Sequence, residues 1–135
     1  MNTIQKKQLL IVEDNELNRK LLVEILSGQY DLLEAENGQA ALDLLAQHSD
    51  SVALILLDII MPVMDGYTFL RKLKADEQLA TIPVIVITQG NTEEDEVTAL
   101  ANGANDFIPK PYRPKVFLHR VACMLKLFES AAISN

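Results

Sequence analysis

The chain has 135 residues, 49% of them hydrophobic, and its 12 basic and 19 acidic side chains give a formal net charge of −7. This length and hydrophobic content predict one domain with one core and exclude a disordered chain. The negative charge argues against direct binding to nucleic acid or to an anionic membrane surface, and no apolar run is long enough to cross a bilayer, so we expect a cytoplasmic protein.

Five short runs in the sequence predict β-strands. Three of them are continuously apolar, which is typical of parallel strands that are covered on both faces. One run is more polar, and we expect it at an edge of the sheet. In chain order the predicted strands are residues 9–12, 30–35 (the edge strand), 53–57, 84–87 and 106–108.

Between these runs, apolar residues recur at helical spacing. Four such sets precede the last strand: Leu17, Leu21, Leu22 and Ile25; Ala41, Leu44, Leu45 and His48; Phe69, Leu70 and Leu73; and Val97, Leu100 and Ala101. The fourth set follows Thr92-Glu93-Glu94-Asp95, which is typical of a capping box. The alternation of strands and helices favours a parallel sheet with right-handed crossovers and helices on both faces.

A last helix is expected to begin after Pro114 and to run to about Glu129. We expect Cys123 to be a small buried residue of this helix. The apolar residues cover more than one core-facing stripe, which indicates a surface for a homodimer or an adjoining domain; a well-buried helix is the alternative. They are Val116, Phe117, Leu118, Val121, Met124, Leu125, Leu127 and Phe128. The domain is expected to span residues 1–128, and 129–135 to be a flexible tail or the start of a linker.

Polar residues follow the predicted strands where each strand ends. Glu13 and Asp14 follow the first, Asp58 the third, Thr88 the fourth, and Lys110 lies just after the fifth. The carboxyl ends of parallel strands line one edge of a sheet, so these side chains are expected in one crevice. Three carboxylates repel one another unless one is protonated or a cation binds, and all-oxygen ligands favour Mg²⁺. An aspartate beside Mg²⁺ and a lysine is suited to forming an aspartyl phosphate.

Four segments, in this order and spacing, resemble the receiver domain of response regulators in two-component signalling. They are LIVEDN at 10–15, LDIIMPVMDG at 57–66, IVIT at 85–88 and GANDFIPKP at 103–111, and the resemblance extends from residue 9 to about 127. It implies an α/β, flavodoxin-like receiver fold: a doubly wound five-stranded parallel sheet of strand order 2-1-3-4-5 with five helices. It also implies a signalling domain that catalyses nothing beyond its own phosphorylation and dephosphorylation.

The resemblance implies that Asp58 accepts a phosphoryl group from the phosphohistidine of a sensor histidine kinase or a histidine phosphotransfer protein. Mg²⁺ would be bound directly by Asp14, by Asp58 and by the backbone carbonyl of Ile60, and through water by Glu13. The domain would belong to a larger regulator or hybrid kinase, or stand alone.

The resemblance also implies that Thr88 donates a hydrogen bond to one phosphoryl oxygen and that Lys110 pairs with another. It further implies a cis peptide bond between Lys110 and Pro111. After phosphorylation, Thr88 would move toward the phosphoryl group and Phe107 would switch, which would change an output surface on the fourth helix, fifth strand and fifth helix. Plain core packing is the alternative role for Phe107.

Some residues depart from the family pattern. Glu13 replaces the commoner aspartate, and Gln89 stands where a small residue is usual, so it would partly cover the site. Apolar Ile60 and Gly90 occupy positions that tune dephosphorylation, and Ile60 predicts a slowly hydrolysed phosphoryl group. Ile60 also disfavours an aspartate-based phosphatase of the haloacid dehalogenase type, which needs a second aspartate there. The remaining alternative is an interaction module that is never phosphorylated.

Overall fold

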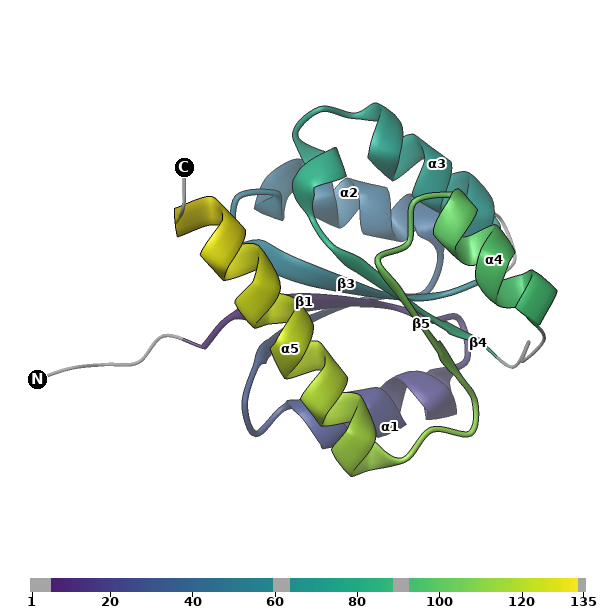
Figure 1. Cartoon of the computed structure of the whole chain (residues 1–135), viewed down its shortest axis with the longest axis vertical. Helices are drawn as coiled ribbons and strands as arrows, with labels where there is room; N and C mark the ends of the chain where they lie inside the picture. Colours follow the sequence, from purple (N-terminus) through teal and green to yellow (C-terminus); the bar gives the residue numbers. More distant parts are fainter. Residues whose placement is uncertain (1–5, 60–63, 89–92, 134–135) are drawn as a thin grey trace, which may run out of the picture.

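A computed structural model of the protein describes residues 6–59, 64–88 and 93–133. Its five strands form one parallel sheet in the order β2-β1-β3-β4-β5 (Figure 1). The strands are β1 (Gln8–Val12), β2 (Asp31–Ala35), β3 (Val52–Asp58), β4 (Val84–Thr88) and β5 (Asp106–Pro109). The predicted strand order is therefore confirmed, as is the edge position of the polar second strand.

Helices cover both faces of this sheet. They are α1 (Glu16–Leu26), α2 (Gly38–His48), α3 (Gly66–Ala75), the short 3₁₀ helix η1 (Leu79–Thr81), α4 (Glu93–Ala101) and α5 (Pro114–Ile133). Helices α1 and α5 lie on one face, and α2, α3 and α4 lie on the other (Figure 1). This is the doubly wound α/β arrangement that the sequence predicts.

The continuous apolar runs are explained by two separate cores, one on each face of the sheet. In β1, Leu9 and Ile11 belong to the core under α1 and α5, whereas Leu10 and Val12 belong to the core under α2, α3 and α4. Successive side chains of a strand point to opposite faces, so a strand that is covered on both faces has to be apolar at every position.

Two of the predicted apolar helix faces differ from the structure. On α1 the sheet-facing residues are Leu22 and Leu26, while Leu17 is 77% exposed. On α4, Ala99 is buried and Val97 is 57% exposed. Helix α4 is short and packs chiefly against β5, so a small residue makes its close contact with the sheet. The predicted capping residue Thr92 lies outside the described residues.

Helix α5 runs to Ile133, beyond the predicted end near Glu129, so part of the expected tail is helical. No glycine or proline follows Pro114 within this helix to end it earlier. Phe117, Val121 and Leu125 are buried against the sheet, whereas Leu127 is 67% exposed.

The apolar surface of α5 is narrower than the sequence indicates, because among its described side chains the exposed large apolar residues are Val116 and Leu127. Use of this face by a homodimer or an adjoining domain stays a prediction. Cys123 is exposed rather than buried, with its Sγ 3.5 Å from His119 Nε2, so that prediction was wrong.

Asp65 caps the N-terminus of α3. Its Oδ1 accepts a hydrogen bond from the Thr68 amide at 2.9 Å, and its Oδ2 accepts one from the Thr68 hydroxyl at 3.0 Å. The bond from the Thr68 amide is the main reason why the pKa of Asp65 lies below its usual value.

Asp65→Ala should lower the free energy of unfolding by about 1 kcal/mol at neutral pH, because the cap is lost. The lowered pKa means that the carboxylate stabilises the fold above its unfolded-state pKa, and this contribution is lost as pH falls through the folded-state pKa. Urea unfolding across the acidic range measures both effects. Asp65→Asn is the control, since asparagine also caps helices; an equal loss in both variants would contradict the capping role.

Candidate functional site

Four strand ends bring the predicted site residues to one edge of the sheet. The parallel register pairs Val12 of β1 with Leu57 of β3, so Glu13 and Asp58 directly follow neighbouring positions. Thr88 at the end of β4 pairs with Pro109 of β5. The convergence predicted from the strand order is therefore present.

Three carboxylates from two strand ends lie close together. Carboxylate oxygens of Glu13, Asp14 and Asp58 all lie within 4.8 Å of one another. Glu13 is 2% exposed and Asp58 is 8% exposed, while Asp14 is open to solvent. An all-oxygen donor set with one solvent-facing member fits a hard divalent cation that keeps some of its water.

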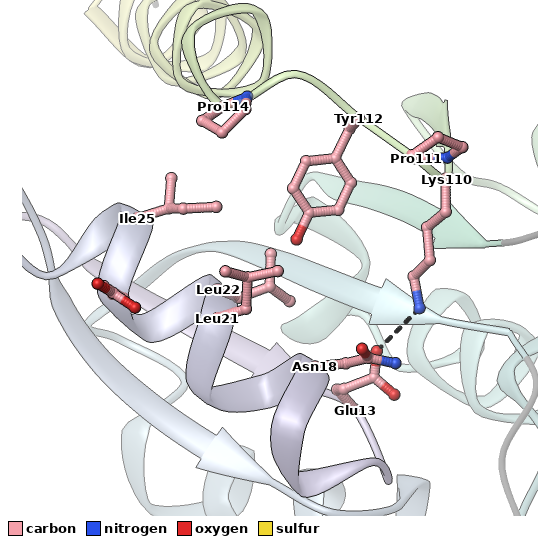
Figure 2. A pocket seen from close by; sticks show the side chains of 10 residues that line it. Glu13, Asn18, Leu21, Leu22, Ile25, Lys110, Pro111, Tyr112 and Pro114 are labelled. Carbon is pink, nitrogen blue, oxygen red and sulfur yellow. Dashed lines mark hydrogen bonds and ion pairs between the residues drawn. The ribbon is translucent and has the colours of Figure 1, made fainter.

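Lys110 supplies the positive charge of this site. Its Nζ lies 3.2 Å from Glu13 Oε1, drawn as a dashed line in Figure 2, and 3.7 Å from Asp58 Oδ2. Its backbone amide donates to the Thr88 carbonyl at 2.8 Å, which ties the start of the loop after β5 to the end of β4. The Lys110-Pro111 peptide bond is cis, as predicted.

Burial and the neighbouring carboxylate of Asp58 change the acidity of Glu13. Burial raises the pKa of Glu13 most, and the hydrogen bond and negative charge of Asp58 raise it further. Lys110 and the backbone amide of Asn15 act in the opposite direction but do not cancel the effect. Part of the raised pKa of Glu13 thus reflects the repulsion expected between neighbouring carboxylates.

The connection from β1 to α1 is held by hydrogen bonds on both sides of Glu13. Its amide donates to the Ala35 carbonyl of β2 at 3.0 Å, and its Oε2 accepts from the Asn15 amide at 3.2 Å. The Glu13 carbonyl accepts from Arg19 Nη1 at 2.9 Å. Sequence reasoning missed both the Arg19 contact and the Glu13–Lys110 pair, because both depend on how far a long side chain reaches.

The connection from β3 to α3 needs a glycine immediately after Asp65. A Cβ added at Gly66 would lie 2.5 Å from the Cα of Ile59 and 2.9 Å from the carbonyl oxygen of Asp58. The Gly66 amide donates to the Ile59 carbonyl at 2.8 Å. Helix α3 thus begins in close contact with the backbone of Asp58, and this contact restrains the backbone of Asp58.

The two predicted switch residues are buried at this edge. Thr88 and Phe107 are both largely shielded from solvent, and Phe107 belongs to the core under α2, α3 and α4. The ring of Phe107 therefore points inward in this structure. Ile60, Gln89 and Gly90 lie outside the described residues, so the predictions made for them stay predictions.

A groove of about 780 Å³ begins at Glu13 and Lys110 and runs between α1 and the start of α5 (Figure 2). Most of the rest of its wall is apolar, with Asn18 and Glu24 as further polar residues. The lining residues are Glu13, Asn18, Leu21, Leu22, Glu24, Ile25, Lys110, Pro111, Tyr112 and Pro114. The Tyr112 ring stacks on Phe117 and directs its hydroxyl toward α1. Leu21 has the spacing of a core residue in the sequence, but in the structure it lines this groove.

Comparison with known protein families matches residues 9–122 to the response regulator receiver domain. The chain belongs to this family. The matched range contains the carboxylate cluster, Thr88, Phe107 and Lys110, so the family and the site are carried by the same part of the chain.

The receiver domain is similar to both short and long proteins. It is 36% identical over 120 residues to chemotaxis protein CheY1 of Helicobacter pylori, covering 87% of this chain and 96% of that protein. It is 37% identical over 122 residues to histidine kinase P4 of Formosa agariphila, covering 90% of this chain but 9% of the kinase. The same module thus occurs as nearly the whole of one relative and as a small part of another.

Solved structures agree with this assignment. The signal receiver domain of a signal transduction histidine kinase from Syntrophus aciditrophicus superposes with a TM-score of 0.81 at 37% identity, covering 89% of this chain and 90% of that one. Receiver domains are signalling modules of two-component systems rather than enzymes in the ordinary sense. Within the described part of the receiver domain, no helix is both long and apolar enough to cross a membrane.

Proposed function

We propose that this receiver domain accepts a phosphoryl group on Asp58 from the phosphohistidine of a sensor histidine kinase or a histidine phosphotransfer protein. The observation that carries the proposal is the position of Lys110, whose Nζ lies 3.7 Å from Asp58 Oδ2 inside a cluster of three carboxylates. A carboxylate that is buried beside a lysine and two further acidic groups has the charge environment that phosphoryl transfer needs.

In the proposed reaction, an Asp58 oxygen forms a bond to phosphorus while the bond from phosphorus to the donor imidazole breaks. The imidazole nitrogen keeps the electron pair and takes up a proton from water. Lys110 and the Thr88 hydroxyl are proposed to bind two of the phosphoryl oxygens. Asp14, Asp58 and the Ile60 carbonyl, with Glu13 through water, are proposed to hold Mg²⁺, which neutralises negative charge on the phosphoryl group as it transfers.

The longer arm of Glu13 gives Lys110 a partner before phosphorylation, at 3.2 Å. Phosphoryl oxygens beside Asp58 offer the ammonium group a more strongly charged acceptor. We therefore expect Lys110 to exchange Glu13 for the phosphoryl group when Asp58 is modified.

The output of the switch is proposed to lie on α4, β5 and α5. Thr88 and Phe107 lie on paired strands, since Val86 pairs with Phe107 and Thr88 with Pro109. Movement of the Thr88 hydroxyl toward a phosphoryl group would thus change the packing next to β5 directly. The buried Phe107 ring favours a response by repacking within the core.

The groove beside the site is proposed to receive the phosphohistidine-bearing protein, because its apolar wall leads directly to Glu13 and Lys110. Leu21→Asp should slow phosphoryl transfer from a phosphohistidine donor about 10-fold, while phosphorylation by acetyl phosphate should not change. Leu100→Asp, at an exposed site on α4, is the matched control. Equal slowing with both phosphodonors would contradict a docking role for this groove.

Intact-mass measurement after incubation with acetyl phosphate and Mg²⁺ tests the proposed function. The native chain should gain the mass of one phosphoryl group, and Asp58→Asn should gain none. An interaction module that is never phosphorylated would show no gain in either protein. Continuous release of phosphate from a small phosphomonoester would favour a phosphatase instead. We further propose that the receiver domain acts in the cytoplasm. Its proposed extent is residues 1–128, although helix α5 continues to Ile133.

A further inference from the structure

Arg19 lies on α1 but reaches two other parts of the site's framework. Its Nη1 donates to the Glu13 carbonyl at 2.9 Å, and its Nε donates to Glu34 Oε1 of β2 at 3.2 Å. The Arg19 side chain is 17% exposed, whereas Glu34 is 45% exposed. One guanidinium group thus joins the end of β1 to the neighbouring strand and to the helix that follows.

The acceptor of the first bond decides what this contact does. The carbonyl of Glu13 and the amide of Asp14 belong to the same rigid peptide unit. Fixing this carbonyl therefore fixes the plane from which the Asp14 side chain projects. Asp14 is the solvent-exposed member of the carboxylate cluster, and burial does little to hold it in place.

We propose that Arg19 is a positioning residue for the cation site: it holds the Glu13–Asp14 peptide unit so that the Asp14 carboxylate stays beside Asp58. The inference rests on the proposed function, because it assumes that the carboxylate cluster binds Mg²⁺. Groups that orient metal ligands without touching the metal commonly change metal affinity about 10- to 100-fold.

Charge and position predict opposite results when Arg19 is replaced. Removal of a positive charge near three carboxylates would by itself strengthen Mg²⁺ binding. Loss of the bond to the Glu13 carbonyl would weaken Mg²⁺ binding, because the Asp14 ligand would have to be ordered when the ion binds. The direction of the change therefore distinguishes positioning from a simple charge effect.

The test is calorimetric titration of the native chain, Arg19→Gln, Arg19→Lys and Glu34→Gln with Mg²⁺, after circular dichroism has established that each is folded. We expect Arg19→Gln to bind Mg²⁺ about 10-fold more weakly than the native chain. Arg19→Lys keeps the charge but has one donor nitrogen in place of two, so its affinity should fall in between. Glu34→Gln keeps the bond to the Glu13 carbonyl, and it should stay within about 2-fold of the native chain.

Amide NMR spectra without metal give a second measurement. The resonances of Glu13, Asp14 and Asn15 should move in Arg19→Gln and stay in place in Glu34→Gln. Native or tighter Mg²⁺ binding by both Arg19 variants, with unmoved resonances, would overturn the role of Arg19 while leaving the proposed function intact. Failure of the native chain to bind Mg²⁺ would overturn the cation site and the role of Arg19 together.

Discussion

A protein carrying Lys110→Met should take up a phosphoryl group from acetyl phosphate about 100-fold more slowly than the native chain. The ammonium group of Lys110 lies within 4 Å of both Glu13 and Asp58, with separations of 3.2 and 3.7 Å. Methionine has a similar length but no charge, so it fills the space without stabilising an incoming phosphoryl group. Intact-mass measurement over time, with saturating Mg²⁺, gives the rate.

Lys110→Met should change Mg²⁺ affinity and the phosphorylation rate in opposite directions. Because a positive charge next to the carboxylates is removed, Mg²⁺ affinity should rise while the rate falls. Lys115→Met, at an exposed position of α5, is the matched control and should change neither quantity. A native phosphorylation rate in Lys110→Met would show that Lys110 has no role in the reaction.

Replacement of Asp58 by asparagine should stabilise the metal-free protein by about 1–2 kcal/mol at neutral pH while abolishing phosphorylation. The negative charge of Asp58 lies beside the buried carboxylate of Glu13, and both its charge and its hydrogen bond raise the pKa of Glu13. The neutral amide is nearly the same size and removes the repulsion. Urea unfolding in the presence of a chelator measures the change.

The free energy of unfolding of the metal-free protein should also depend on pH, in a direction that the raised pKa of Glu13 determines. Since the pKa of Glu13 is raised in the folded state, the unfolded chain loses this proton first, and stability of the metal-free protein falls as pH rises from the ordinary glutamate pKa through the raised one. This fall should be smaller in Asp58→Asn, because burial alone then raises the pKa of Glu13. Asp43→Asn, at an exposed position on α2, should behave as the native chain. Equal slopes in all three proteins would contradict the repulsion.

Much of the fold follows from the sequence, because strands covered on both faces have to be apolar throughout. In an α/β protein, a continuously apolar run such as residues 84–87 fits few places other than a strand covered on both faces. The strand-end residues Asp58 and Thr88 could be assigned to one site for a topological reason, since parallel strands end at the same edge. None of these assignments depends on the packing of individual side chains.

The remaining features depend on side-chain packing and reach, which residue spacing does not encode. Glu13 and Lys110 are 97 positions apart and meet because the glutamate arm is long enough. Arg19 has the sequence context of a solvent-facing helix residue, yet it binds the Glu13 carbonyl. On α4, Val97 and Leu100 have core-like spacing, but the helix packs through the small residue Ala99.

The measurement that tests phosphoryl transfer to Asp58 most directly is chemical mapping of the modified residue. The protein is treated with acetyl phosphate, with and without Mg²⁺, and then with borohydride, which reduces an acyl phosphate to an alcohol. Peptide mass spectrometry should find homoserine in place of Asp58, and only in the sample that contained Mg²⁺. Reduction at another carboxylate, or an unmodified Asp58 in folded protein with saturating Mg²⁺ and either acetyl phosphate or a phosphohistidine donor, would contradict the proposed function.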